Sequence, residues 1–123
     1  MITEEQILVL AQMVHGANKA YCEATGDTSQ FSWNEAPETI RSSAVAGVRA
    51  IVTNPSITPE DLHVSWMKER ISDGWVYGTI KDVDKKTHPC LVPYNELPAR
   101  ERFKDSLFRS VVLTYLNFPK GLL

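Results

Sequence analysis

The sequence predicts a mainly α-helical fold: a single compact domain of about four helices, with a small β-hairpin between the third helix and the last. Apolar residues recur at three- and four-residue intervals in four segments, and Gly or Pro residues separate these segments. One stretch before the last helix instead mixes Trp, Tyr, Gly and Pro with no helical period. A chain of 123 residues has the size of one ordinary domain, so we expect residues 1–123 to form one.

The first two helices are expected over residues 3–25 and 37–53, packed onto the rest of the chain. Thr3 and Gln6 have capping-box spacing, and Gly26 supplies a C-terminal stop for the first helix. Pro37 suits the first turn of the second helix. The apolar stripe of that helix consists of Ile40, Ala44, Val45, Val48 and Ile51.

The third helix is expected to start at Thr58, which has Pro59 next to it and Asp61 three residues on, and to end at Gly74. The letters "WVYGTI" then predict a strand, and "CLVPY" predicts a returning arm that a proline limits to a sheet edge. A charged turn over residues 82–86 would join the two arms. The last helix is expected to begin near Pro98 and to end at Phe118 and Pro119.

An internal echo links two of these helix starts. Residues Asn34, Glu35, Pro37 and Arg41 are matched in type and spacing by Asn95, Glu96, Pro98 and Arg102. Both sets open a helix, with Asn as a cap and Pro in the first turn. The pattern by itself leaves open whether it records a duplication or only shared capping chemistry.

Composition and charge exclude several classes of function. The chain has 43% hydrophobic residues, 23% charged residues and a net charge of −2, which is typical of a globular protein and too acidic to grip nucleic acid by its phosphates. Residues 1–22 are too acidic and too interrupted by polar residues for a signal peptide or a membrane span. Cys22 and Cys90 are then read as reduced thiols, and we expect a cytoplasmic protein.

The chemistry-bearing residues predict no enzyme, no metal site and no cofactor. His15 and Cys22 are two turns apart on one helix, too far for a direct hydrogen bond. His88 and Cys90 flank a proline and would point to the same side of an extended segment. No metal-binding spacing and no glycine-rich phosphate loop is present. A small hydrolase that uses His88 or Cys22 stays an alternative, which turnover of a nucleotide would support.

Residues 62–102, read as "LHVSWMKERISDGWVYGTIKDVDKKTHPCLVPYNELPARER", resemble the RyR domain, the repeat of ryanodine receptor calcium channels. The combination of "GWVYG", "HPCLVPY" and "LP" at this spacing carries the resemblance, and the first sixty residues resemble those of free-standing prokaryotic and bacteriophage members. The resemblance implies a mostly helical fold with a small hairpin, and it does not imply a channel. It also implies an accessory module that senses or traps nucleotide-derived signals of the cyclic ADP-ribose type, as a sponge in phage counter-defence would.

The residues and the resemblance together predict a non-enzymatic module that binds an adenine-nucleotide or ADP-ribose-like ligand in a bacterial or phage-infected cell. Amphipathic aromatics near cations suit a planar anionic ligand. The predicted site residues are Trp33, Trp75 and Tyr77 for stacking, Lys86, His88, Arg102 and Arg109 for the anion, and His15, Asn18 and Tyr21 for a polar wall.

Two alternatives stay open for the same residues. The aromatics of the hairpin could fix it onto the helices, with His88 hydrogen-bonded internally. They could also anchor a protein interface, including that of a homodimer, without any small-molecule ligand.

Overall fold

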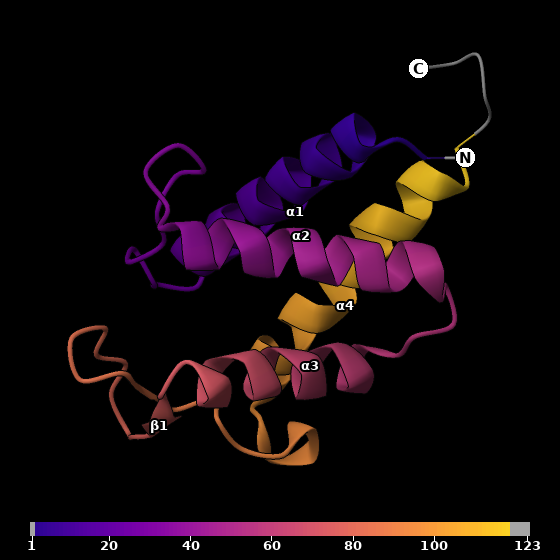
Figure 1. Cartoon of the computed structure of the whole chain (residues 1–123). Helices are drawn as coiled ribbons and strands as arrows, with labels where there is room; N and C mark the ends of the chain where they lie inside the picture. The colour runs from indigo at the N-terminus through magenta and orange to yellow at the C-terminus, as the bar shows by residue number, and fades with distance from the viewer. Residues whose placement is uncertain (1, 119–123) are drawn as a thin grey trace. The chain divides into compact units, whose positions relative to one another are not determined.

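The computed structural model describes residues 2–118, and the described part of the chain confirms the predicted fold class. The elements in chain order are α1 (Glu4–Ala24), α2 (Glu38–Thr53), α3 (Pro59–Ser72), β1 (Val76–Tyr77), β2 (Thr87–His88), the short 3₁₀ helix η1 (Tyr94–Glu96) and α4 (Ala99–Leu116) (Figure 1). The predicted helix boundaries agree with these to within about two residues, the usual ambiguity of helix ends. The predicted stop at Pro119 lies outside the described residues.

The chain divides into two compact units. Unit 1 comprises Met1–Ile57 and Ser106–Leu123, and unit 2 comprises Thr58–Asp105. Helix α4 begins in unit 2 and continues into unit 1. The expectation of one domain over residues 1–123 stays a prediction.

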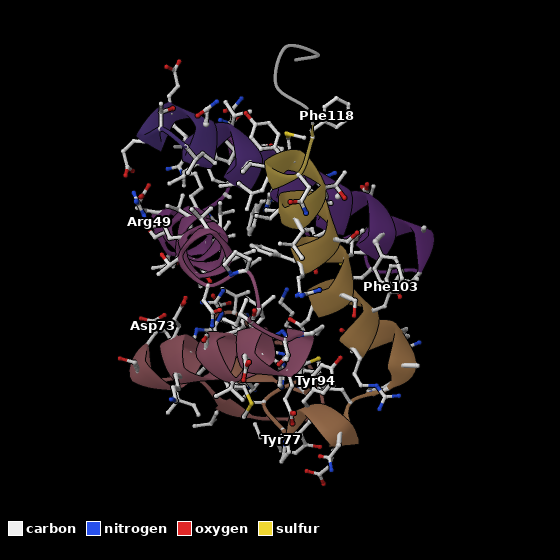
Figure 2. The ribbon with its side chains drawn as sticks, turned by 90° about the vertical axis from the view of Figure 1, so that its right-hand side faces the viewer. Arg49, Asp73, Tyr77, Tyr94, Phe103 and Phe118 are labelled. Carbon is white, nitrogen blue, oxygen red and sulfur yellow. The ribbon has the colours of Figure 1, made fainter. Side chains whose placement is uncertain are left out.

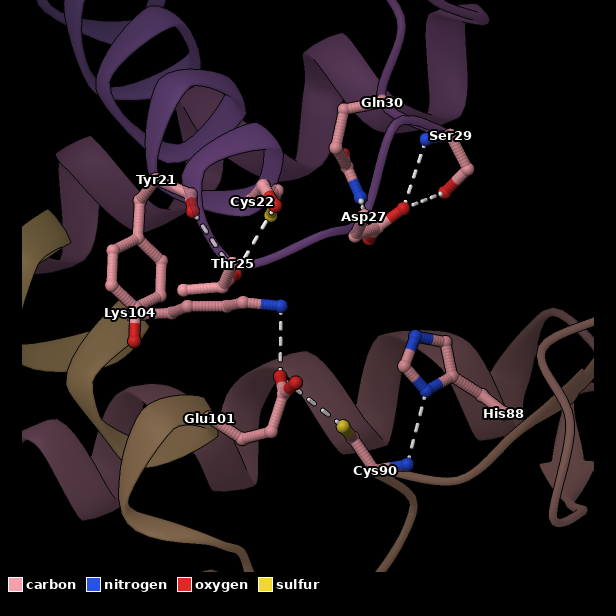
Figure 3. A network of polar contacts seen from close by, with 10 residues as sticks. All are labelled: Tyr21, Cys22, Thr25, Asp27, Ser29, Gln30, His88, Cys90, Glu101 and Lys104. Atoms are coloured by element: carbon pink, nitrogen blue, oxygen red, sulfur yellow. Dashed lines mark hydrogen bonds and ion pairs between the residues drawn. The ribbon is translucent and has the colours of Figure 1, made fainter.

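In unit 1, α1 is capped at both ends as its sequence predicts. The Thr3 side chain accepts from the Gln6 N–H at 3.1 Å, and the Gln6 side chain accepts from the Thr3 N–H at 2.8 Å. At the other end Gly26 adopts a φ of 99°, and the Asp27 N–H donates to the Cys22 carbonyl at 2.8 Å. The turn that follows is held by Ser29, whose N–H and hydroxyl both donate to Asp27 (Figure 3). This turn leads the chain from α1 back toward α2.

The core of unit 1 lies along α1 and α2, which run side by side in Figure 1. Its largest fully buried side chains are Leu10, Val14, Cys22, Val48, Ile51 and Val112. Phe108 packs directly on Gly47, where an added Cβ would lie 2.7 Å from the ring. Gly47 is therefore required by the close approach of α4 rather than by its backbone conformation.

In unit 2, α3 is capped in the same way as α1. Thr58 and Asp61 form the predicted capping box, with both hydrogen bonds at 3.1 Å. Gly74 adopts a φ of 89°, and the Trp75 N–H donates to the Arg70 carbonyl at 2.9 Å. The first glycine of "GWVYG" is thus the residue that ends α3.

A small sheet forms in the segment of the predicted hairpin, but it is not a hairpin, because its strands are parallel and its second strand is not the predicted arm. The strands β1 and β2 pair in parallel, with Val76 opposite Thr87 and Tyr77 opposite His88. The chain reverses its direction between β1 and β2, in a turn closed by Asp82 and Thr87. The N–H group of each of these residues donates to the carbonyl of the other at 3.0 Å. At Gly78 an added Cβ would lie 2.7 Å from the Thr87 Cβ, so the second glycine of "GWVYG" permits this close pairing.

The predicted returning arm "CLVPY" is not a strand because its backbone donors are used elsewhere or are missing. The Cys90 N–H donates to the His88 side chain at 3.0 Å. Pro89 and Pro93 have no N–H to give. Leu91 turns into the core with 8% of its surface exposed.

The helix pairs α1–α2 and α3–α4 share one structural device, in which a buried histidine of the first helix holds the loop that leads to the second. In the first, the buried His15 side chain donates through Nε2 to the Phe31 carbonyl at 2.6 Å, and its ring contacts Trp33 at 5.7 Å. In the second, the buried His63 donates to the Val92 carbonyl at 2.8 Å, and its ring contacts Tyr94 at 5.9 Å.

The surroundings of this device also correspond, position by position. The two histidines stand at the same distance before Gly26 and Gly74, which both end a helix with a positive φ. Ala36 and Leu97, which precede the two helix-opening prolines, are 4% and 5% exposed. These correspondences extend well beyond capping letters, so they favour a duplication as the origin of the echo.

Candidate functional site

A groove of about 490 Å³ lies in unit 1 along α1 and α2. Its lining residues are Leu8 of α1, Trp33 of the connecting loop, and Glu38, Arg41, Ser42, Val45, Ala46 and Arg49 of α2. The volume is within the range of about 300–1,000 Å³ that small-molecule sites occupy. The groove therefore has room for a nucleotide-sized ligand.

The groove combines an apolar surface with one large aromatic ring. Leu8, Val45 and Ala46 supply aliphatic surface, and Leu8 leaves 46% of its own surface exposed. Trp33 is held by the edge-on contact with His15, which in turn fixes the loop through the Phe31 carbonyl. His15 thus fixes the Trp33 ring and does not line the groove itself.

Two arginines of α2 supply positive charge to the groove, and each already pairs with a carboxylate. Both terminal nitrogens of Arg49 donate to Glu4 of α1, one of them at 2.8 Å to Oε1 and the other to Oε2. Arg41 donates through Nη2 to Glu38 at 3.0 Å. The hydrogen bond from Arg49 lowers the pKa of Glu4 below its ordinary value, and the same bond raises the pKa of Arg49.

The groove is not a by-product of the repeated fold, because the second helix pair lacks its main components. Helix α1 has 21 residues against 14 in α3, and the extra turns carry Glu4 and Leu8. At the places of Trp33, Glu38 and Arg49, the second pair has Tyr94, Ala99 and Ser110. Only Arg41 has a counterpart of the same type, Arg102. The first pair has therefore been elaborated beyond what its fold needs.

The predicted site residues are divided between the two units, and the structure brings together two of them in unit 1 and three, Trp75, Tyr77 and His88, in unit 2. In unit 1, His15 and Trp33 are in contact, whereas Asn18 and Tyr21 are half-buried further along α1. Arg109 donates to the Ile57 carbonyl at 2.6 Å and to the Pro55 carbonyl at 3.4 Å. Its guanidinium therefore holds the chain that follows α2.

In unit 2, His88 lies within a cluster of aromatic rings. Its ring centroid is 5.0 Å from Trp66 and 6.1 Å from Trp75. Burial, assisted by the positive charges of Lys81 and Lys104, lowers the pKa of His88 to about 4. The imidazole is uncharged at neutral pH and accepts the Cys90 N–H through Nδ1, which fits the structural alternative for this residue.

The remaining predicted residues of unit 2 lie around β1 and on α4. Tyr77 is 56% exposed at the outer edge of the unit (Figure 2). Lys86 donates to the Asp73 carbonyl at 2.7 Å and thereby ties the loop to the end of α3. Arg102 is half-buried on α4.

The Cys90 thiol belongs to a polar chain in the same unit. It donates to Glu101 at 3.6 Å, and Lys104 contacts the same carboxylate at 2.8 Å (Figure 3). Burial, with the negative charge of Glu101, raises the pKa of Cys90 to about 12, so the thiol stays protonated at neutral pH. Among residues 2–118, no group of three metal-ligating side chains gathers at one place.

Most of the groove is absent from the site predicted by the sequence. Arg41 enters the sequence prediction only through the echo, and Leu8, Ser42 and Arg49 are not among the predicted site residues. The available signal was that Arg41, Val45 and Arg49 fall on one side of α2. It becomes informative only when the adjacent helix is known, because Leu8 and Glu4 complete the groove from a distant part of the sequence.

Comparison with protein families finds a match to the RyR domain over residues 36–117, more than half of the chain. The matched range runs from the start of α2 through α4. Helix α1 and Trp33 lie outside it. None of the described helices is both long and apolar enough to cross a membrane.

Proposed function

The chain belongs to the RyR domain family, and on this premise we propose that it is a non-enzymatic module that binds an adenine-nucleotide or ADP-ribose-like ligand in the groove of unit 1. The observation that carries the proposal is the combination of Trp33 with Arg41 and Arg49 along an apolar surface. Stacking on an indole and bidentate pairing with a guanidinium are the two interactions that a nucleotide base and a phosphate accept best.

The proposal revises the set of binding residues expected from the sequence. Trp33 keeps its stacking role. His15 holds the Trp33 ring in place without lining the groove. Arg41 and Arg49 take the role of anion partners because both line the groove, whereas Arg109 does not line it and His88 is uncharged. A protein that binds such a signal without turning it over would sequester it, as a phage counter-defence protein in the cytoplasm would.

Thermal unfolding of the purified chain with a panel of ligands tests the proposal. ATP, ADP-ribose, cyclic ADP-ribose isomers and cyclic dinucleotides should be compared at millimolar concentration. A ligand that binds only the folded chain raises the unfolding midpoint. We expect a shift with at least one compound and its loss in Trp33→Ala. The absence of any shift across the panel would contradict the proposal.

A second candidate function, a protein-interaction module that forms homo-oligomers, is favoured by the apolar surface of unit 2. The segment from the end of α3 to the charged turn exposes five large apolar side chains. Their exposed fractions are 57% for Ile71, 58% for Val76, 56% for Tyr77, 76% for Ile80 and 59% for Val83. Surfaces of this kind often mark protein interfaces. A ligand-independent mass that increases with protein concentration, and that returns to the monomer value in Ile80→Ser, would support this function.

A further inference from the structure

We infer that the groove of unit 1 selects ligands that carry two separated anionic groups, each of which displaces one of the chain's own carboxylates. This inference rests on the proposed function and specifies the class of ligand. Its basis is the arrangement of the two ion pairs along α2.

The two guanidinium groups are spaced along the helix rather than gathered at one point. Arg41 and Arg49 lie eight residues apart on α2, which puts their Cα atoms roughly 12 Å apart along the axis at the normal helical rise. Both side chains line the same groove. One phosphate at one end would leave the charge at the other end unused, whereas two separated phosphates can engage both.

The carboxylates of Glu38 and Glu4 occupy these two positions in the free chain. Glu4 binds Arg49 with both carboxylate oxygens, in the two-pronged geometry that a phosphate also uses. Glu38 binds Arg41 through one oxygen and also accepts from the Ser42 hydroxyl at 3.2 Å. In the free chain each carboxylate therefore occupies the position beside an arginine that an anionic group of the ligand would take.

These internal pairs are suited to displacement because water reaches them. The exposed fractions are 74% for the Glu4 side chain and 76% for Glu38, against 50% for Arg49 and 33% for Arg41. Solvent screening makes exposed ion pairs weak, and a released carboxylate is readily hydrated. A phosphate carries more charge than a carboxylate, so it can replace either one at little cost to the fold.

The two partners of one ion pair provide a matched test. Glu4→Gln and Arg49→Gln remove the same contact between α1 and α2, so any structural consequence of losing it is shared. Their effects on ligand binding are opposite, because one variant removes the competing anion and the other removes the cation. Glu5→Gln makes the same charge change as Glu4→Gln next to it on α1 and serves as the control, since Glu5 does not line the groove.

The experiment is titration calorimetry at low ionic strength with AMP and with adenosine bisphosphate, which carries phosphates at both ends of its ribose. We expect the bisphosphate to bind about tenfold more tightly than AMP, a difference of one additional charged pair. Glu4→Gln should strengthen bisphosphate binding about threefold and Arg49→Gln should weaken it about tenfold, while Glu5→Gln leaves it unchanged.

Two outcomes would overturn the inference in distinguishable ways. If AMP binds in a Trp33-dependent manner but the bisphosphate binds no more tightly, or if Glu4→Gln and Arg49→Gln shift bisphosphate binding in the same direction, the two-anion inference fails and the proposed function survives. If neither nucleotide binds the unmodified chain and the broader panel gives no shift, both fail together.

Discussion

At the scale of single residues, His88 illustrates how burial changes the role of a side chain. The sequence marks it as a cation for an anionic ligand, because an imidazole near lysines can be charged close to neutral pH. The structure puts it in contact with two tryptophan rings, with Nδ1 accepting a backbone N–H. Its contribution is to the stability of unit 2.

The lowered pKa of His88 predicts that the chain loses stability in mild acid. The unfolded chain binds a proton at His88 below pH 6.5, whereas the folded chain binds it only below about pH 4. Stability from this group is therefore complete above pH 6.5 and is lost as the pH falls through that window. We expect a loss of about 2 kcal/mol, allowing for partial exposure.

The variant His88→Asn tests this expectation because its side-chain oxygen can still accept the Cys90 N–H while no group titrates. Urea unfolding at pH 7 and pH 4 should show a smaller difference in the variant than in the unmodified chain. Equal differences in the two proteins would show that His88 is not the group responsible.

The raised pKa of Asp105 predicts that stability changes with pH in the direction opposite to the effect of His88, over an overlapping pH range. Burial raises the pKa of Asp105 from 3.8 to about 7, so the folded chain keeps a proton that the unfolded chain has released. Stability from this group falls as the pH rises from about 4 to 7 and stays low above it. Asp105→Asn should therefore unfold at higher urea concentration than the unmodified chain at pH 8, with no gain at pH 4. A gain of equal size at both pH values would contradict this account.

At the scale of elements, the helices could be predicted from the sequence because their signals are local. The capping boxes at Thr3 and Thr58 and the helix-ending glycines Gly26 and Gly74 act within a few residues, and all four are confirmed. The direction of the β pairing could not be predicted in the same way. It depends on a turn closed between Asp82 and Thr87 and on the diversion of the Cys90 N–H to a side chain.

The contact of Gly47 with Phe108 gives a prediction about how α2 and α4 pack within unit 1. Alanine at a helical position normally stabilises by about 1 kcal/mol relative to glycine. At Gly47 the added Cβ would lie 2.7 Å from the Phe108 ring, and overpacking of this kind costs about 1–3 kcal/mol. Gly47→Ala should therefore destabilise the chain by about 1 kcal/mol net.

The sign of the effect should reverse once the ring is removed. In the background of Phe108→Ala the clash is absent, so Gly47→Ala should stabilise by about 1 kcal/mol through helix propensity alone. Urea unfolding of the four proteins of this double-mutant cycle provides the measurement. A stabilisation of equal size in both backgrounds would mean that Phe108 does not pack on Gly47 as described.

At the scale of the whole molecule, comparison of the two helix pairs distinguishes the residues that the fold requires from the residues that occur in one pair only. The buried histidine, the carbonyl that it holds and the helix-opening proline occur in both helix pairs, so they serve the fold. The longer α1, Trp33 and Arg49 occur in one pair only, and they gather at the groove. The family match covers most of the shared framework and leaves α1 outside.

This separation also explains which part of the candidate site could be predicted. Trp33 can be identified because an aromatic residue in a polar loop is conspicuous in sequence. Arg49 cannot, because an arginine on a helix is ordinary until Glu4 and Leu8 of another helix are seen beside it. A groove between two helices is encoded by residues far apart in the chain, and no local pattern reports it.

The most direct test is a titration of the isotopically labelled chain with adenosine bisphosphate, followed by the indole N–H signals of its three tryptophans. We expect the Trp33 signal to move with saturation, together with backbone signals of α2 around Arg41 and Arg49. The signals of Trp66 and Trp75 should stay in place. Movement of the Trp75 signal with Trp33 unchanged would assign binding to the segment around β1 and contradict binding in the groove. A titration that moves none of the three signals would also contradict it.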